Sequence, residues 1–186
     1  MLRGPVTDKY ICDKFLEMME NKSCFSIKVT ELIKYANIGR STFYVHFDSI
    51  DDLIQKIEDD FLAGLPDAES VSFLQTKENA INFRKAIVKY VKKNANVVRA
   101  FLGPYGDPAF QIKVKNRVSK KLDAYYINND AWSPNLSDGE KKLILEFIAG
   151  GRQQMGIWWI LNGDEVSIED FFKAVRKIME KLRTFS

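Results

Sequence analysis

Five side chains that can donate hydrogen bonds are gathered in one short stretch of the sequence. They are Arg40, Ser41, Thr42, Tyr44 and His46. If this stretch is a helix, Phe43 and Phe47 lie four residues apart on a buried face and leave the polar side chains on the other side. A guanidinium, hydroxyls and an imidazole are groups that bind base edges and phosphate oxygens. A short helix with this polar face suits the floor of a DNA major groove.

A second short helix, which begins near Lys28, is expected to hold the first one in place. Its apolar stripe has the spacing of one helix face and consists of Val29, Leu32, Ile33 and Ala36. Asn37 tolerates the left-handed backbone that ends a helix, and Gly39 can be the N-cap of the next helix. Lys28 and Arg40 open the two helices, where their charges can neutralise phosphates. The pattern predicts a helix-turn-helix over residues 28–47, with Lys28 and Gly39 among its DNA-contact residues.

The helix that begins at Arg40 ends in the run TFYVHF, residues 42–47, which resembles the T-[FL]-Y-x-[HY]-F run of the tetracycline-repressor-like (TetR/AcrR) transcription regulators. The match extends to apolar residues on both sides, at Leu32, Ala36, Ile38 and Leu53. The resemblance implies that Tyr44 and His46 contact DNA. For His46, a structural role beneath the turn is the alternative. The resemblance also implies an all-α protein of about nine helices, with a three-helix DNA-binding domain followed by a ligand-sensing and dimerisation domain.

The composition fits a soluble globular protein. Hydrophobic residues make up 46% of the 186 residues and charged residues 28%, enough for a full core and a polar surface. No apolar run approaches the ~20 residues of a membrane span, and no leader precedes the first helix, so we expect a cytoplasmic protein without a membrane partner. Cys12, Cys24 and the single histidine fit neither a disulfide framework nor a metal site, so we expect no metal and no cofactor.

The charge balance leaves an alternative open. The net charge is +3, but the first 65 residues hold 8 basic and 11 acidic residues. This acidic balance would suit a helical small-molecule-binding or protein-interaction protein with a vestigial helix-turn-helix. A later basic stripe, which is more often a solvated face than a nucleic-acid surface, consists of Lys113, Arg117, Lys120 and Lys121.

Helix caps divide the chain into helices. Candidate N-caps are Thr7, Ser49, Asp107, Ser137 and Ser167. We expect the helix after Thr7 to reach about Lys22 and the helix after Pro108 to reach about Asn128. The stretch over residues 64–76 contains a glycine, a proline and small polar residues, which predicts a boundary between modules. We therefore expect a helix-turn-helix DNA-binding domain over residues 1–65 and a helical effector-binding and dimerisation domain over residues 66–186.

The helix that follows Ser137 is apolar on more than one face, so it must be covered on more than one side. A second subunit is a natural cover, and the last two helices resemble the four-helix dimer interface of tetracycline-repressor-like proteins. The predicted interface residues are Ile148, Gly151, Met155, Ile157, Phe171, Val175 and Ile178. We expect a homodimer.

Aromatic residues concentrate near turns in the second module. Candidate pocket residues are Phe101, Tyr105, Phe110, Trp132 and Trp158. Aromatic side chains of this kind either line a pocket for a small hydrophobic effector or fill the core, and the sequence favours neither. In the second case the module would serve dimerisation or a protein partner.

The sequence has no glycine-rich phosphate loop, nucleophile elbow or metal-ligand cluster, so we do not expect an enzyme. We expect a transcriptional regulator, a repressor, that binds a near-palindromic double-stranded DNA operator as a homodimer. A ligand or a partner would release it from the operator.

Overall fold

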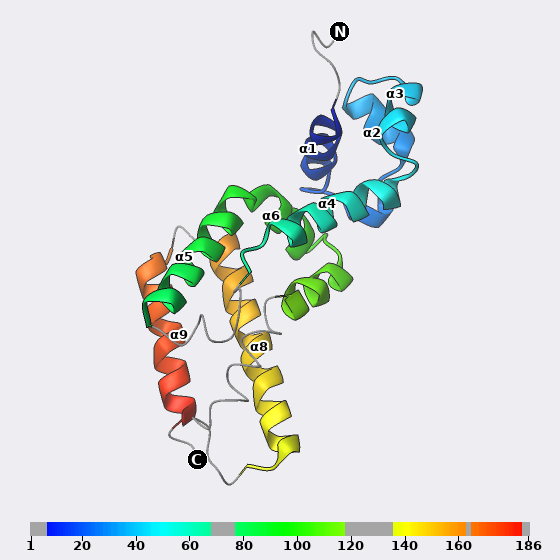
Figure 1. Cartoon of the computed structure of the whole chain (residues 1–186). Coiled ribbons are helices and arrows are strands. Elements are labelled where there is room, and N and C mark those ends of the chain that lie inside the picture. Colours follow the sequence, from blue (N-terminus) through cyan, green and yellow to red (C-terminus); the bar gives the residue numbers. More distant parts are fainter. Residues whose placement is uncertain (1–6, 68–76, 118–135, 163–164, 184–186) are drawn as a thin grey trace. The chain divides into compact units, whose positions relative to one another are not determined.

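The computed structural model describes residues 7–67, 77–117, 136–162 and 165–183. Within these ranges every regular element is helical, which confirms the all-α prediction (Figure 1). The elements are α1 (Asp8–Met18), the 3-10 turn η1 (Cys24–Ser26), α2 (Val29–Tyr35), α3 (Arg40–His46), α4 (Ile50–Gly64), α5 (Lys77–Lys93), α6 (Ala95–Leu102), α8 (Asp138–Leu161) and α9 (Ile168–Arg183). Residues 108–117 are helical as well.

The chain folds as two compact units. The first comprises Met1–Leu65 together with Asn94–Gln111, and the second comprises Pro66–Lys93 together with Ile112–Ser186. The expected DNA-binding segment, residues 1–65, thus folds with a second segment that contains α6 and the turn after it.

Serine and threonine caps begin the helices where the sequence predicts them. Thr7 accepts a hydrogen bond from the backbone N–H of Tyr10, and Ser49 accepts one from that of Asp52. Ser137 and Glu140 form the predicted capping box at the start of α8. The corresponding caps at 107 and 167 accept from the N–H groups of residues 109 and 170. Each cap satisfies an N–H group that the first helical turn leaves without a partner.

The core of the first unit lies among α1, α2, α3, α4 and α6. Its fully buried side chains include Ile11, Phe15, Leu32, Phe43, Leu53, Val98, Phe101 and Phe110. The ring of Phe110 lies 5.6 Å from that of Phe61 in α4 and 5.3 Å from that of Phe101 in α6, measured between centroids. These aromatic contacts hold the 94–111 segment in the first unit.

The turn after α6 requires a glycine. The N–H of Asp107 donates to the carbonyl oxygen of Phe101 over 3.2 Å, which folds the chain back on the end of α6. A Cβ atom added to Gly106 would lie 1.9 Å from that same oxygen, so no other residue fits the observed backbone.

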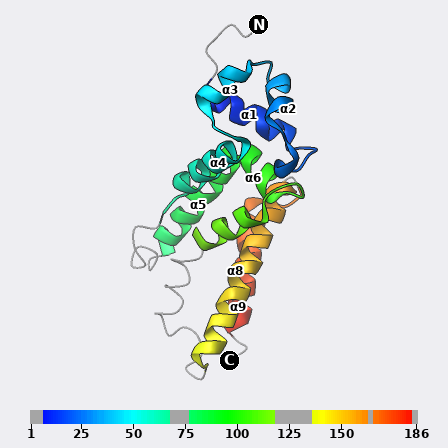
Figure 2. The same cartoon turned by 90° about the vertical axis from the view of Figure 1, so that its right-hand side faces the viewer.

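The second unit is built around Trp159. Its indole ring is 4% exposed, lies 5.6 Å from the ring of Phe171 in α9, and donates its Nε1–H to the carbonyl oxygen of Val166 over 2.9 Å. The ammonium of Lys92 in α5 lies 5.0 Å from the ring centroid. The chain reverses between α8 and α9, which run in opposite directions (Figure 2). None of the helices in the described ranges combines the length and the apolar composition that crossing a membrane requires.

One predicted boundary differs from the structure. The apolar pattern of the first helix extends to about Lys22, but α1 ends at Met18. The chain then turns into η1, which buries Cys24 completely. The predicted end of the helix after Pro108, near Asn128, lies outside the described residues.

Candidate nucleic-acid interface

The turn between α2 and α3 has the backbone that its sequence predicts. Asn37 has a φ of 51°, in the left-handed region, and the N–H of Ile38 donates to the carbonyl oxygen of Ile33 over 3.0 Å. This pair of features closes α2. Gly39 then caps α3 with an extended backbone, as the sequence indicates.

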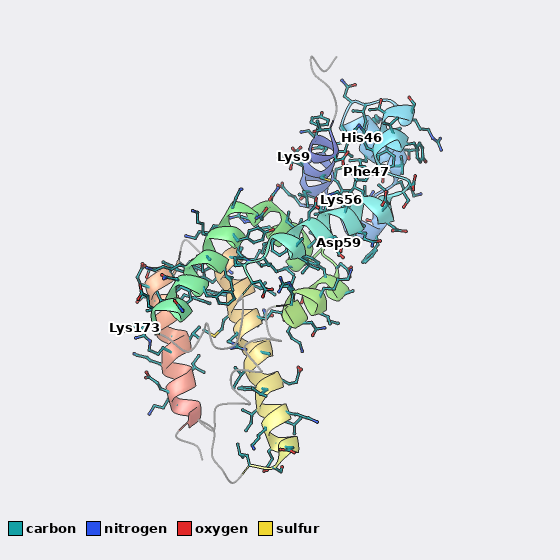
Figure 3. All side chains as sticks on the ribbon, in the orientation of Figure 1. Lys9, His46, Phe47, Lys56, Asp59 and Lys173 are labelled. Carbon is teal, nitrogen blue, oxygen red and sulfur yellow. The ribbon has the colours of Figure 1, made fainter. Side chains whose placement is uncertain are left out.

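The helix α3 is attached to the core by aromatic side chains on one side. Phe43 is fully buried, and its ring centroid lies 6.0 Å from that of Phe47, which is 3% exposed. Phe47 directly follows the helix, next to His46 (Figure 3). Arg40, Ser41 and Tyr44 are exposed on the helix, whereas Thr42 is half-buried. The guanidinium carbon of Arg40 lies 5.6 Å from the centroid of the Tyr44 ring, a cation–π distance. The side of α3 that avoids the core therefore presents a positive charge, an aromatic hydroxyl and an aliphatic hydroxyl.

His46, the last residue of α3, makes a polar contact within the chain. Its Nδ1 lies 2.7 Å from the Oδ1 of Asp8, and its side chain is 20% exposed. The structural interpretation of His46 is therefore supported by a contact with α1. The second ring nitrogen is a separate polar atom, so this contact leaves room for a phosphate contact as well.

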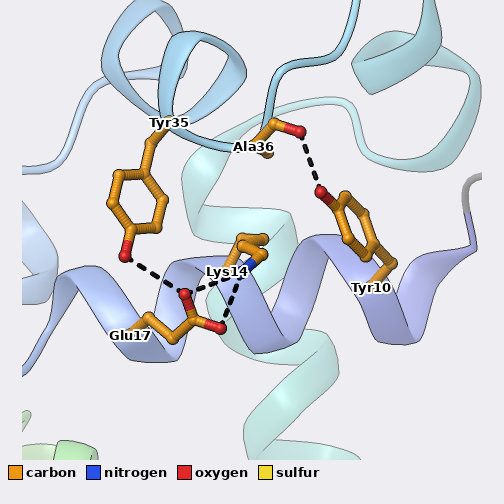
Figure 4. A network of polar contacts seen from close by, with 5 residues as sticks. All are labelled: Tyr10, Lys14, Glu17, Tyr35 and Ala36. Atoms are coloured by element: carbon orange, nitrogen blue, oxygen red, sulfur yellow. Dashed lines mark hydrogen bonds and ion pairs between the residues drawn. The ribbon is translucent and has the colours of Figure 1, made fainter. Parts of the chain in front are cut away.

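A polar network attaches α1 to α2 (Figure 4). The hydroxyl of Tyr10 donates to the carbonyl oxygen of Ala36, the C-cap of α2, over 2.9 Å. Glu17 accepts from the hydroxyl of Tyr35 over 3.1 Å and from the ammonium of Lys14 over 2.8 Å. The Lys14 hydrogen bond holds the pKa of the Glu17 carboxyl below its ordinary value. The network fixes the end of α2, and with it the position where α3 begins.

Lys28 lies in front of α2 and is exposed. Its backbone N–H donates to Glu31, whose carboxylate also accepts from the ammonium of Lys22 over 2.8 Å. The Lys22 hydrogen bond lowers the pKa of Glu31. The exposed Lys28 side chain therefore lies at the start of the helix-turn-helix. The carboxylate of Glu31 is already paired with the ammonium of Lys22.

Intramolecular ion pairs also compensate other acidic residues of the first unit. Three such pairs on its helices are Lys9–Asp13, Lys14–Glu17 and Lys56–Asp60. Both partners of each pair are already counted in the charge of the first 65 residues, so the pairs neutralise these carboxylates locally along α1 and α4 but leave the net acidic balance unchanged.

One exposed residue of α3 was missed by the sequence analysis. Val45 is 79% exposed, between Tyr44 and His46. Valine has no polar group, so the sequence did not indicate a functional role for this residue. Only its exposure in the folded chain makes it a candidate contact residue.

The candidate pocket residues that the structure describes belong to both units. Phe101 and Phe110 are fully buried in the core of the first unit, and Tyr105 is 46% exposed in the turn after α6. Trp158 belongs to the second unit and is 44% exposed. Trp132 lies outside the described residues.

The candidate interface residues differ in exposure within the single chain. Ile148 and Ile157 are 4% and 7% exposed, so their side chains pack inside the second unit. Gly151 and Ile178 are exposed, whereas Met155, Phe171 and Val175 are half-buried.

The capped helices α2 and α3, with a polar outer face, form a helix-turn-helix in a chain whose described elements are all helical. Residues 78–181, more than half of the chain, match the TetR family model described as "Transcriptional regulator C-terminal region". The chain therefore belongs to the TetR family of transcriptional regulators.

Two solved structures have a similar fold. A TetR transcriptional regulator from Streptococcus agalactiae 2603V matches with a TM-score of 0.62 and 19% identity over 92% of each chain. The dihydroxyacetone kinase operon activator DhaS matches with a TM-score of 0.57 and 20% identity over 98% of each chain. No curated protein sequence matches the chain.

Proposed function

We propose that this chain binds a near-palindromic DNA operator as a homodimer and represses transcription until a ligand or a protein partner releases it. The observation that carries the proposal is the outer face of α3, where Arg40, Ser41 and Tyr44 are exposed on a helix anchored by Phe43. Donors of these types bind guanine edges and phosphates in a major groove. The proposed DNA contacts also include Lys28, Gly39, Thr42 and His46. A protein with this function is not an enzyme and works in the cytoplasm.

The proposed dimer uses an exposed apolar face of α8. Its large side chains are Leu143, Phe147, Trp158 and Leu161, which are 73%, 69%, 44% and 39% exposed. They are spaced so that they follow one side of the helix, and Gly151 lies between them. A Cβ added to Gly151 would meet no described atom within 4 Å, so nothing inside the described protomer requires a glycine there. A closely approaching helix of a second subunit supplies a reason for it, and from α9 the exposed Ile178 would join the contact.

The second unit, which holds most of the residues that match the C-terminal family model, is the proposed sensor. A ligand there regulates binding only if it favours one arrangement of the two α3 helices over another. A coupling free energy of ~1–3 kcal/mol would change operator affinity roughly 5- to 150-fold.

Activation is the second candidate for the direction of regulation. The similar chain DhaS is described as an operon activator, so the same fold serves activation in that protein. A reporter gene placed behind the operator distinguishes the two: deleting the regulator raises expression if it represses and lowers expression if it activates.

The operator itself can be found by selecting duplexes from a random library with the full-length chain. Arg40→Ala should then weaken binding by ~1–3 kcal/mol if Arg40 binds a guanine edge, or weaken all sequences equally if it binds phosphate. Lys85→Ala, an exposed residue of α5, is the matched control and should leave affinity unchanged. If no sequence is enriched, or if Arg40→Ala and Tyr44→Ala both bind as the wild type does, α3 does not read DNA and the alternative of a vestigial helix-turn-helix is favoured.

A further inference from the structure

The exposed face of α3 has an apolar residue at its centre. A helix has 3.6 residues per turn, so the residues two before and two after a given position lie on the opposite side. Phe43 is fully buried, and the two residues opposite to it are Ser41 and Val45. With 79% of its surface exposed, Val45 is the most exposed large apolar side chain among the described residues.

The stability of the folded chain does not explain a valine at this position. A β-branched side chain lowers helix propensity, and an exposed one gains little burial energy within the protomer. Hydrogen-bond donors lie beside it on the same helix, at Arg40, Ser41 and Tyr44. This face of α3 therefore combines polar groups with one apolar side chain. It would complement a binding surface that is also polar and carries one isolated apolar group.

The major groove of DNA is such a surface. Its base edges are rows of donors and acceptors, and the apolar group that they present is the C5-methyl of thymine. We propose that Val45 contacts the C5-methyl of one thymine in each operator half-site and thereby selects a T·A pair there. This inference rests on the proposed function, because it requires α3 to enter the major groove.

The test removes the methyl group without changing the base pairing. The operator is first selected from the random duplex library with the full-length chain, and each thymine is then replaced in turn by deoxyuridine. For the wild type, one thymine in each half-site should be sensitive, and its replacement should weaken binding about fourfold, the effect of ~0.8 kcal/mol for one methyl.

Variants of Val45 assign the effect to this side chain. Val45→Ala should bind the thymine and deoxyuridine duplexes equally at the sensitive position. Val45→Thr retains one methyl in nearly the same shape, and it should retain the preference for thymine. Because Val45 is so exposed, neither variant should unfold at a clearly lower temperature than the wild type, and Val45→Ala should unfold at a slightly higher one because alanine has the higher helix propensity. A thermal melt checks this.

Two results would overturn the inference while the proposed function stands. One is a wild-type affinity that no deoxyuridine replacement changes, and the other is a thymine preference that Val45→Ala leaves undiminished. If the library yields no enriched duplex at all, the proposed function fails and this inference fails with it.

Discussion

The Nδ1 of His46 lies 2.7 Å from the Oδ1 of Asp8, so the last turn of α3 is joined directly to the first turn of α1. The contact spans 38 positions of sequence. It stabilises the orientation of α3 through a helix that itself carries no residue of the proposed DNA face.

The first prediction separates the two roles of His46. Asp8→Ala and His46→Ala should each lower the free energy of unfolding by no more than ~1 kcal/mol, because the pair is partly exposed. If His46 also binds phosphate, His46→Ala should weaken operator binding more than Asp8→Ala does, and its salt slope should fall by about 1. Operator titrations at several salt concentrations measure both quantities.

The double variant completes this cycle. If His46 acts only through Asp8, the two single variants and the double variant should bind the operator with the same affinity. That result would leave His46 with the structural role alone.

The second prediction compares two tyrosines of the α1–α2 network. Tyr10→Phe should lower the free energy of unfolding by about 1 kcal/mol, because it leaves the half-buried carbonyl of Ala36 without its donor. Tyr35→Phe is the matched control: it removes the bond to an exposed Glu17 that still binds Lys14, and it should cost less than ~0.5 kcal/mol. Urea denaturation of both variants checks the order, and equal costs would contradict it.

Local hydrogen bonds explain why much of the fold could be predicted from the sequence. The caps Thr7, Ser49 and Ser137 bind N–H groups three residues away, and the turn at Asn37 depends on one backbone angle. Such signals are complete within a few residues, and the structure confirms them.

Features that depend on distant parts of the chain were not predictable in the same way. The 94–111 segment folds with the first unit because Phe101 and Phe110 pack near Phe61, and no local pattern specifies that choice. The helix α8 is apolar on more than one face, and packing within the second unit decides that Ile148 and Ile157 are buried. Val45 carries no polar group, so only its exposure draws attention to it.

The third prediction concerns the reactivity of Cys12. Burial, together with the nearby charge of Asp8, raises the pKa of this half-buried thiol to about 12. The folded chain therefore holds the proton more tightly than the unfolded chain, in which the thiol has a pKa of ~8.5. The stability that this adds is complete below the unfolded pKa and is lost as the pH rises toward 12.

The measurement is alkylation by iodoacetamide at pH 8. Cys12 should react at least ~100-fold more slowly in the native chain than in the denatured chain, because the thiolate is the reactive form. Cys24 is fully buried, and burial raises its pKa as well, so it would also react slowly. The experiment therefore uses the Cys24→Ala variant, in which Cys12 is the remaining cysteine. Rapid alkylation of native Cys24→Ala at pH 8 would show that the thiol is not protected.

The last prediction tests the dimer on the exposed face of α8. Phe147→Asp replaces a side chain that is 69% exposed in the protomer, so the fold should tolerate it. In the proposed dimer the same carboxylate would be buried without a partner, which should weaken association by at least ~2 kcal/mol, or about 30-fold. Lys142→Ala, at the exposed position one residue before Leu143, is the control and should remain dimeric.

Gly151→Ala sharpens the test, because its two effects have opposite signs. The added methyl meets no described atom of the protomer within 4 Å, so it should stabilise α8 by up to ~1 kcal/mol through helix propensity. It would also hold a partner helix farther away, so the dimer should dissociate at a higher concentration than the wild type. Light scattering over a dilution series measures the association, and thermal unfolding of monomeric Phe147→Asp, with and without Gly151→Ala, measures the stability. A wild-type chain that is monomeric at micromolar concentration would contradict the proposed homodimer. A Phe147→Asp variant that remains dimeric would place the interface elsewhere, because an aspartate buried on this face would cause a measurable loss of affinity.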